Sequence, residues 1–138
     1  MTPRGQPAEE GFVTLELVLG LVVLILPIML LVLTLPTWFA RQNIARLAAQ
    51  EAARTAVLDS SLGQGTSAAQ QIGANYGLAS GDMAVSFAPS SGLQPGDSVT
   101  SQVTVRMPAV TIPGLGSVGG FSWTAVFSEQ VDLYRSAP

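Results

Sequence analysis

The 138-residue chain contains no cysteine, no histidine and no lysine, so all six of its basic residues are arginine. Without cysteine it has no disulfide, no thiolate nucleophile and no cysteine-bound metal. Without histidine it lacks the commonest general base and the commonest metal ligand. The sequence also has no G-x-S-x-G motif and no phosphate-binding loop. We therefore predict no catalytic residue, no metal site and no cofactor, and expect the protein not to be an enzyme.

Charge is also scarce. Only 11% of the residues are charged, and the net charge is −3. No basic patch is present, so nucleic acid is not an expected partner. Hydrophobic residues make up 48% of the chain, which is too many for a disordered protein. Much of this apolar content lies in one block near the N-terminus, which points to a membrane segment beside one small domain.

This apolar block runs from Leu17 to Ala40 without a single charge. Its 24 residues, as a helix, would extend roughly 36 Å, enough to cross the hydrocarbon core of a bilayer. The block is longer than the apolar core of a secretory signal peptide. A buried helix of a soluble protein is the alternative, but so short a chain could hardly cover it on all sides. We predict a single membrane span, with Trp38 and Phe39 as interfacial anchors.

The charges that flank the span leave its orientation open. Arginines 41, 46 and 54 follow it, whereas Arg4 and two glutamates precede it. By the positive-inside rule alone, the C-terminal part would lie in the cytoplasm.

The junction before the span carries the sharpest signal. If the chain is cut after Gly11, Phe12 becomes the new N-terminus and Glu16 the fifth residue of an otherwise apolar run. A carboxylate inside lipid is costly and seeks a partner. The free α-amine of Phe12 on a neighbouring subunit would match it in charge and depth. The alternative is that Glu16 is simply the last polar residue before an uncut anchor, with Gly11 as a linker.

Beyond the span, residues 41–61 contain no glycine or proline and are rich in alanine, which predicts a continuing helix. Its small residues suit either packing against helices of other subunits or lying on a small sheet, and we favour the sheet. Gly63 and Gly65 are expected to break the helix, and Thr66 or Ser67 to cap a second, short helix.

From residue 83 onward the apolar residues recur with a period of two. This alternation predicts strands around residues 83–88, 99–107 and 121–133, with a turn at Pro95–Asp97. Glu129 interrupts the apolar face of the third strand, which suggests a bulge or the end of the strand. The glycine-rich segment 108–120 is interpreted as a long loop, with a contact surface as the alternative. One apolar face predicts an antiparallel sheet covered by the preceding helix.

The expected fold is thus α+β. A long N-terminal transmembrane helix extends into an amphipathic helix, which packs on a small antiparallel β-sheet of about three strands. The expected divisions are a leader (1–11), the transmembrane helix and its extension (12–62), and a small extracytoplasmic domain (63–138).

The segment from Gly11 to Glu16 resembles the type IV prepilin signal, in which a glycine, an aromatic residue and a glutamate follow a short leader. With the helical stretch from Gln50 to Arg54 and a β region that ends near Tyr134, most of the chain resembles the TadE-like proteins of tight-adherence (Flp) pilus systems. The leader has fewer positive charges than is usual, and Pro27 falls later than the family's membrane-helix proline.

The resemblance implies a minor pilin or pseudopilin of a type IVb-like pilus, cut by a prepilin peptidase between Gly11 and Phe12. It implies a single pass through the cytoplasmic membrane, with the leader inside and the C-terminal domain outside. This orientation is the opposite of the one that the positive-inside rule alone would give. Its implied partners are other pilins and pilus-assembly platform proteins. The alternative function is an uncleaved, membrane-anchored accessory or binding protein of the cell envelope.

Overall fold

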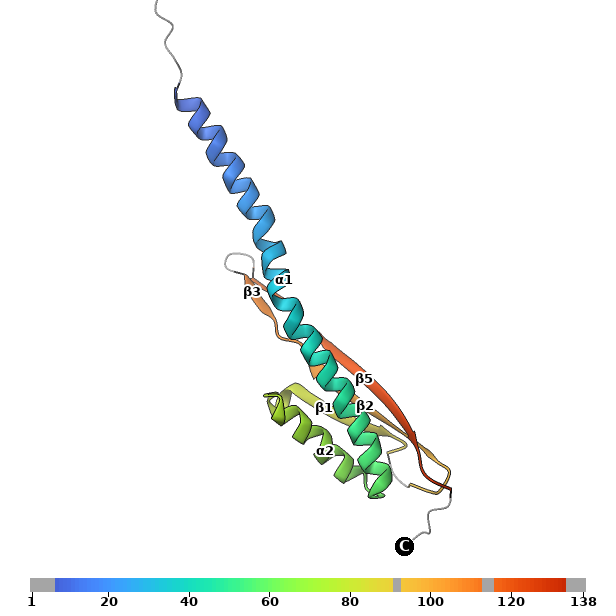
Figure 1. Cartoon of the computed structure of the whole chain (residues 1–138). Coiled ribbons are helices and arrows are strands. Elements are labelled where there is room, and N and C mark those ends of the chain that lie inside the picture. Colours follow the sequence, from blue (N-terminus) through green and yellow to red (C-terminus); the bar gives the residue numbers. More distant parts are fainter. Residues whose placement is uncertain (1–6, 91–92, 113–115, 134–138) are drawn as a thin grey trace, which may run out of the picture. The chain divides into compact units, whose positions relative to one another are not determined.

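A computed structural model describes residues 7–90, 93–112 and 116–133 of the chain (Figure 1). The expected C-terminal landmark at Tyr134 and the first residues of the leader lie outside these ranges. The chain divides into two compact units, Met1–Pro36 and Thr37–Pro138. The helical extension that follows the apolar block therefore belongs to the same unit as the strands.

The first helix, α1 (Pro7–Leu58), is 52 residues long and carries both the apolar block and its alanine-rich extension. Proline suits the first turn of a helix because its missing N–H would have no partner there. Pro27 and Pro36 lie inside α1 without ending it, and the division between the two units falls directly after Pro36.

The second helix, α2 (Leu62–Asn75), begins earlier than the sequence predicted. Its N-cap is Ser61, whose side chain accepts a hydrogen bond from the backbone N–H of Gln64. The expected helix break at Gly63 and Gly65 is wrong, because both glycines lie within α2. An added Cβ at Gly65 would stand 2.5 Å from the carbonyl oxygen of Ala52 in α1. Gly65 thus permits close packing of two helices, and it does not end one.

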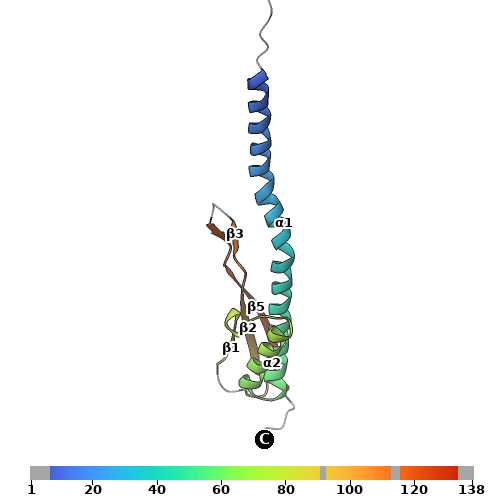
Figure 2. The same cartoon turned by 90° about the vertical axis from the view of Figure 1, so that its left-hand side faces the viewer.

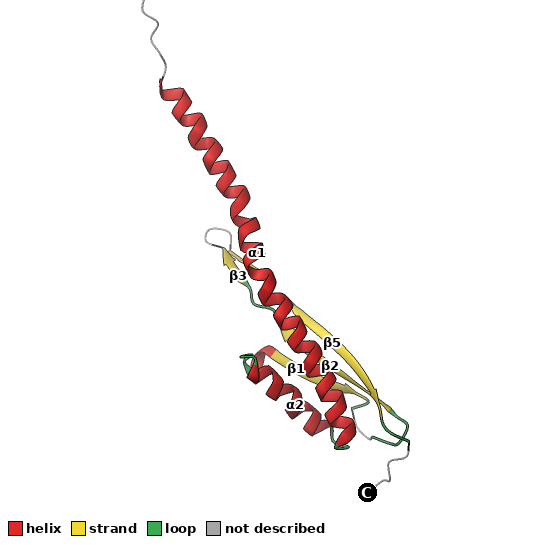
Figure 3. Cartoon of the chain, in the orientation of Figure 1, coloured by secondary structure: helices red, strands yellow, loops and turns green. Residues whose placement is uncertain are grey.

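A short 3₁₀ turn, η1 (Ser80–Asp82), leads into an antiparallel three-stranded sheet in the order β1-β2-β5. Its strands are β1 (Met83–Ala88), β2 (Ser98–Arg106) and β5 (Ser122–Gln130) (Figure 3). The pairing of β2 with β5 is unbroken from Ser98–Gln130 to Arg106–Ser122, so Glu129 lies at the end of a strand and not at a bulge. The predicted turn at Pro95–Asp97 is confirmed by the hydrogen bond from the Asp97 N–H to the Gln94 carbonyl.

The segment 108–120 is not a plain loop. It contains two short antiparallel strands, β3 (Val110–Ile112) and β4 (Gly116–Val118). Proline and glycine flank strands of only three residues, so the alternation that marks longer strands had no room to appear in the sequence.

The core of the second unit lies between α1, α2 and the sheet (Figure 2). Alanines supply the contact surface of α1, and each is at most 1% exposed. They are Ala45, Ala48, Ala49, Ala52, Ala53 and Ala56. Val103 and Val105 face them from β2. The sequence's preferred use for these small residues, packing on a sheet, is confirmed, and so is the α+β fold.

Side-chain contacts join α1 to the strands along this core. Ser101, fully buried in β2, donates a hydrogen bond to the Ala49 carbonyl. Arg41 forms an ion pair with Asp82 at 3.4 Å and also donates to the Arg106 carbonyl. These contacts fix the beginning of the second unit's helix against η1 and the end of β2.

Candidate functional site

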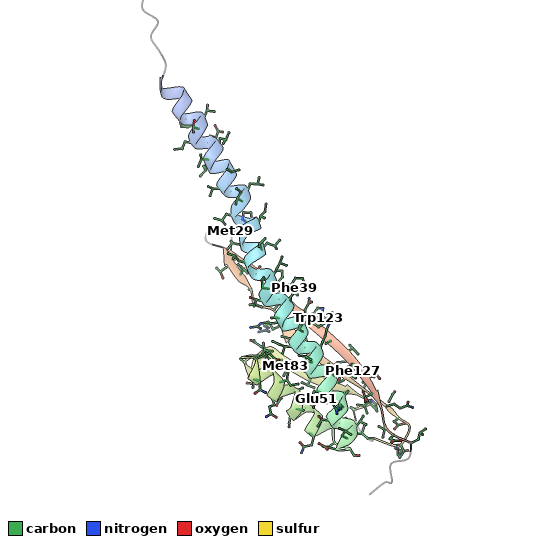
Figure 4. All side chains as sticks on the ribbon, viewed as in Figure 1. Met29, Phe39, Glu51, Met83, Trp123 and Phe127 are labelled. Carbon is green, nitrogen blue, oxygen red and sulfur yellow. The ribbon has the colours of Figure 1, made fainter. Side chains whose placement is uncertain are left out.

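Among the described residues, none buries the apolar part of α1 from Phe12 to Met29. Every side chain from Phe12 to Met29 is exposed, and Figure 4 shows Met29 projecting from this part of the helix. The most apolar stretch of 18 residues has a mean hydropathy of 3.1 and is 0% buried. The core helix of a soluble protein would be mostly buried. This helix is long and apolar enough to span a membrane.

Glu16 is the only charged residue on this uncovered surface between Phe12 and Met29. It follows Phe12 by four residues, about one helical turn, so the two side chains lie on the same face of α1. Within the described part of the chain no ion pair or hydrogen bond reaches the Glu16 carboxylate. Among the described residues, Glu16 is therefore an uncompensated acid on an apolar helix.

The predicted processing site, Gly11–Phe12, lies inside α1, because the helix begins at Pro7 in the intact chain. A protease binds the bond that it cuts in an extended form, so cleavage here would require the first turns of α1 to unwind. Glycine lowers the cost of unwinding, since it stabilises a helix by about 1 kcal/mol less than alanine does.

The two predicted interfacial anchors differ in their surroundings. Phe39 is 59% exposed, whereas Trp38 is half-buried and meets the ring of Phe121 edge-on, with centroids 5.3 Å apart. The indole N–H of Trp38 is buried without a hydrogen-bond partner among the described residues. Anchoring by both residues stays a prediction, and Trp38 has a packing role that the sequence did not reveal.

Two other side-chain contacts also could not be predicted from the sequence. Arg41 and Asp82, which form the ion pair, are 41 residues apart, and no local pattern links them. The guanidinium of Arg46 lies 5.2 Å from the centroid of the Trp123 ring, a cation–π contact. Two of the three arginines that follow the span thus make contacts in the folded second unit.

A second candidate region is a hollow in the surface of the second unit. A hollow between α2 and β1 is lined by residues without a titratable side chain: Gln70, Gly73, Ala74, Leu78, Ala79, Ser80 and Met83. Among residues 7–90, 93–112 and 116–133 no three acidic, histidine or cysteine side chains gather as a metal site would require. The candidate site is therefore the exposed N-terminal part of α1 with Glu16.

No family model, no curated protein and no solved structure matches the chain.

Proposed function

We propose that this protein is a non-catalytic, membrane-anchored minor pilin or pseudopilin of a tight-adherence (Flp) pilus system, similar to the TadE-like proteins. A prepilin peptidase removes residues 1–11, and Phe12 becomes the mature N-terminus. Glu16 then pairs with the α-amine of Phe12 on a neighbouring subunit as the helix joins the assembly.

The observation that supports this proposal most directly is the position of Glu16. It lies on an apolar helix whose side chains from Phe12 to Met29 are all exposed. A carboxylate near the edge of the bilayer costs less than the about 2.5–3.5 kcal/mol found at its centre, yet the cost still favours a cationic partner. The described chain supplies no such partner. A neighbouring subunit's amine, at the same depth, would.

The proposed topology places the leader in the cytoplasm and the second unit outside. By the positive-inside rule, the number of arginines after the span argues against this topology. Two of these arginines, however, make contacts in the folded second unit. Arg41 is held by Asp82 and by a backbone carbonyl, and Arg46 covers Trp123. Because these contacts give both arginines a role in the folded second unit, their presence after the span does not require this unit to lie in the cytoplasm.

The second candidate is an uncleaved anchored protein of the cell envelope. One observation favours it: the Gly11–Phe12 bond lies within a helix that starts at Pro7. In that case Glu16 is an ordinary polar residue at the edge of the span, and its loss has no consequence for assembly.

Substitution of Glu16 distinguishes the two candidates in a host that makes the pilus. We expect Glu16→Ala and Glu16→Gln each to reduce recovery of the protein in sheared pili, or the number of pili, because the neighbour's amine loses its counter-charge. The amount of protein in the membrane fraction should stay the same, since either change makes the span more apolar.

Val18→Ala is the matched control, because Val18 is an exposed apolar residue of the same helix. It should leave both pilus recovery and membrane insertion unchanged. Normal piliation with both Glu16 variants would remove the proposed role of the carboxylate and favour the uncleaved anchor.

A further inference from the structure

Strand β5, the return strand of the β2–β5 hairpin, forms one edge of the three-stranded sheet. Among the described residues it pairs with β2 on one side and with no strand on the other. It is nine residues long, contains neither lysine nor proline, and pairs with β2 without a bulge. Lysine, proline and bulges are features by which monomeric proteins keep other strands away from a sheet edge. The only charged residue of β5 is Glu129, next to its end. The strand is therefore open to pairing with a further strand.

The hydrogen bonds at the two ends of β5 show which of its backbone groups face the open side. The Met107 N–H donates to the Phe121 carbonyl, and the Val131 N–H donates to the Asp97 carbonyl. Both pairs continue the register in which β2 and β5 are aligned. Because bonded and non-bonded pairs alternate in an antiparallel ladder, the odd-numbered residues of β5 bond to β2. The N–H and C=O groups of the even-numbered residues, from Ser122 to Gln130, therefore face away from β2.

The odd-numbered side chains of β5 lie on the face of the sheet that packs against α1. Ala125 is buried there, whereas Trp123 and Phe127 pack against the core and are only half-buried (Figure 4). On the opposite face Val126 is 60% exposed. Among the described residues, the open edge thus leaves apolar surface uncovered on both faces of the sheet, and a further strand would bury it.

Two side chains of opposite charge lie on the α1 side of the sheet, at opposite ends of β5. The Arg46 guanidinium, from α1, is 5.2 Å from the centroid of the Trp123 ring. Glu129 is half-buried near the other end of the strand. Among the described residues, neither Arg46 nor Glu129 takes part in an ion pair within the chain. One copy therefore presents a cation beside the beginning of β5 and an anion near its end.

The sequence of β5 is complementary to itself when a second copy is placed antiparallel, with the two Val126 residues opposite each other. All nine residues of each strand are then paired. The even-numbered residues are opposite one another, as their outward N–H and C=O groups require. On the α1 side, Ala125 lies opposite the large Phe127 of the second copy. Trp123 lies opposite Glu129 of the second copy, which brings that carboxylate beside Arg46. Because the arrangement is two-fold symmetric, each of these contacts forms twice.

We propose that two copies of this chain associate through the antiparallel pairing of their β5 strands, with Arg46 of each copy paired to Glu129 of the other. The backbone hydrogen bonds join the two sheets into one continuous sheet, and the half-buried aromatic rings become further buried. The two ion pairs fix the register, because a shift by two residues would separate each arginine from its carboxylate. The contact uses only residues of the second unit, and it depends neither on cleavage after Gly11 nor on Glu16.

The absence of cysteine allows the contact to be tested by cross-linking of the full chain in detergent. Val126→Cys places one thiol at the two-fold axis, where the facing Cα atoms of a hydrogen-bonded pair are about 5.5 Å apart, within disulfide range. Gln102→Cys is the matched control, because Gln102 is the exposed partner of Val126 on β2. We expect mild oxidation to give severalfold more covalent dimer with Val126→Cys than with Gln102→Cys. Equal yields would mean random collision and would overturn the pairing.

Charge reversal tests the register. Arg46→Glu and Glu129→Arg should each lower the yield of the Val126→Cys dimer severalfold, because each change places like charges opposite one another. The variant with both changes should restore the yield, since the two ion pairs re-form with their signs exchanged. If it cross-links no better than the single changes, the contact between Arg46 and Glu129 is overturned, and with it the proposed pairing. A chain that stays monomeric at all concentrations in size-exclusion chromatography with light scattering would leave the edge to another protein and would overturn the association of copies.

Discussion

Gly63 and Gly65 stand two residues apart in α2, yet of the two only Gly65 is a position where an added Cβ would meet α1. A Cβ at Gly65 would lie 2.5 Å from the Ala52 carbonyl oxygen, 2.9 Å from the Phe87 ring and 3.0 Å from the Ala56 Cβ. At Gly63 the nearest atom of this kind is the Ser61 hydroxyl at 3.7 Å. At this scale the absence of one methyl group determines how closely the two helices approach.

We expect Gly65→Ala to lower the free energy of unfolding of the second unit by about 1–3 kcal/mol, because backbone and core atoms must move apart. Gly63→Ala is the matched control and should be neutral or stabilising by up to about 1 kcal/mol, since alanine favours a helix. Thermal unfolding of the full chain in detergent, followed by tryptophan fluorescence, measures both, because Trp38 and Trp123 lie in this unit. Equal midpoints for the two variants would contradict the packing described here.

At the scale of the element, the alanine face of α1 sets the distance between the helix and the sheet. Ala48 is fully buried in the core, and Val103 and Val105 belong to the same cluster. Ser101 reaches the Ala49 carbonyl with a side chain of only two heavy atoms, which requires the helix and strand to be close. Larger residues on this face have no space to occupy.

Replacement of Ala48 by leucine should therefore destabilise the second unit by about 1–3 kcal/mol through overpacking. Gln50→Leu, at an exposed position of the same helix, adds a leucine of the same size and should change stability by less than about 0.5 kcal/mol. The same thermal unfolding measurement compares them. A Gln50 variant as unstable as the Ala48 variant would show that leucine is harmful here for reasons other than space.

Much of the element order was predictable because the patterns were long. The apolar block, the alanine-rich extension and the alternation in β1, β2 and β5 each extend over enough residues to show their period. The start of α2 was missed because glycine usually weakens helices, whereas here Gly65 is needed for a contact with α1, distant in sequence. Strands β3 and β4 were missed because each has three residues.

The candidate site was only partly predictable for a similar reason. Glu16 was recognisable because a single charge in an apolar run is a local feature. The packing of Trp38 on Phe121 and of Arg46 on Trp123 depends on the hairpin's return along α1. Such contacts join residues far apart in the chain, and no spacing in the sequence predicts them.

At the scale of the whole molecule, the two units of the chain differ in whether their apolar residues are buried. The second unit buries its apolar residues between α1, α2 and the sheet. The segment from Phe12 to Met29 is exposed among the described residues, and in the proposed function lipid or other subunits bury its apolar surface. In the proposed function, the membrane surrounds the apolar part of α1 until Glu16 pairs with the α-amine of Phe12 on a neighbouring subunit and the helix joins the assembly.

The measurement that tests this account most directly is the N-terminal residue of the protein extracted from the membranes of its native host, determined by intact mass and N-terminal sequencing. The account predicts Phe12 as the first residue, with residues 1–11 removed. A mature chain that begins at Met1 or Thr2 would contradict it, because no free amine would then lie at the depth of Glu16.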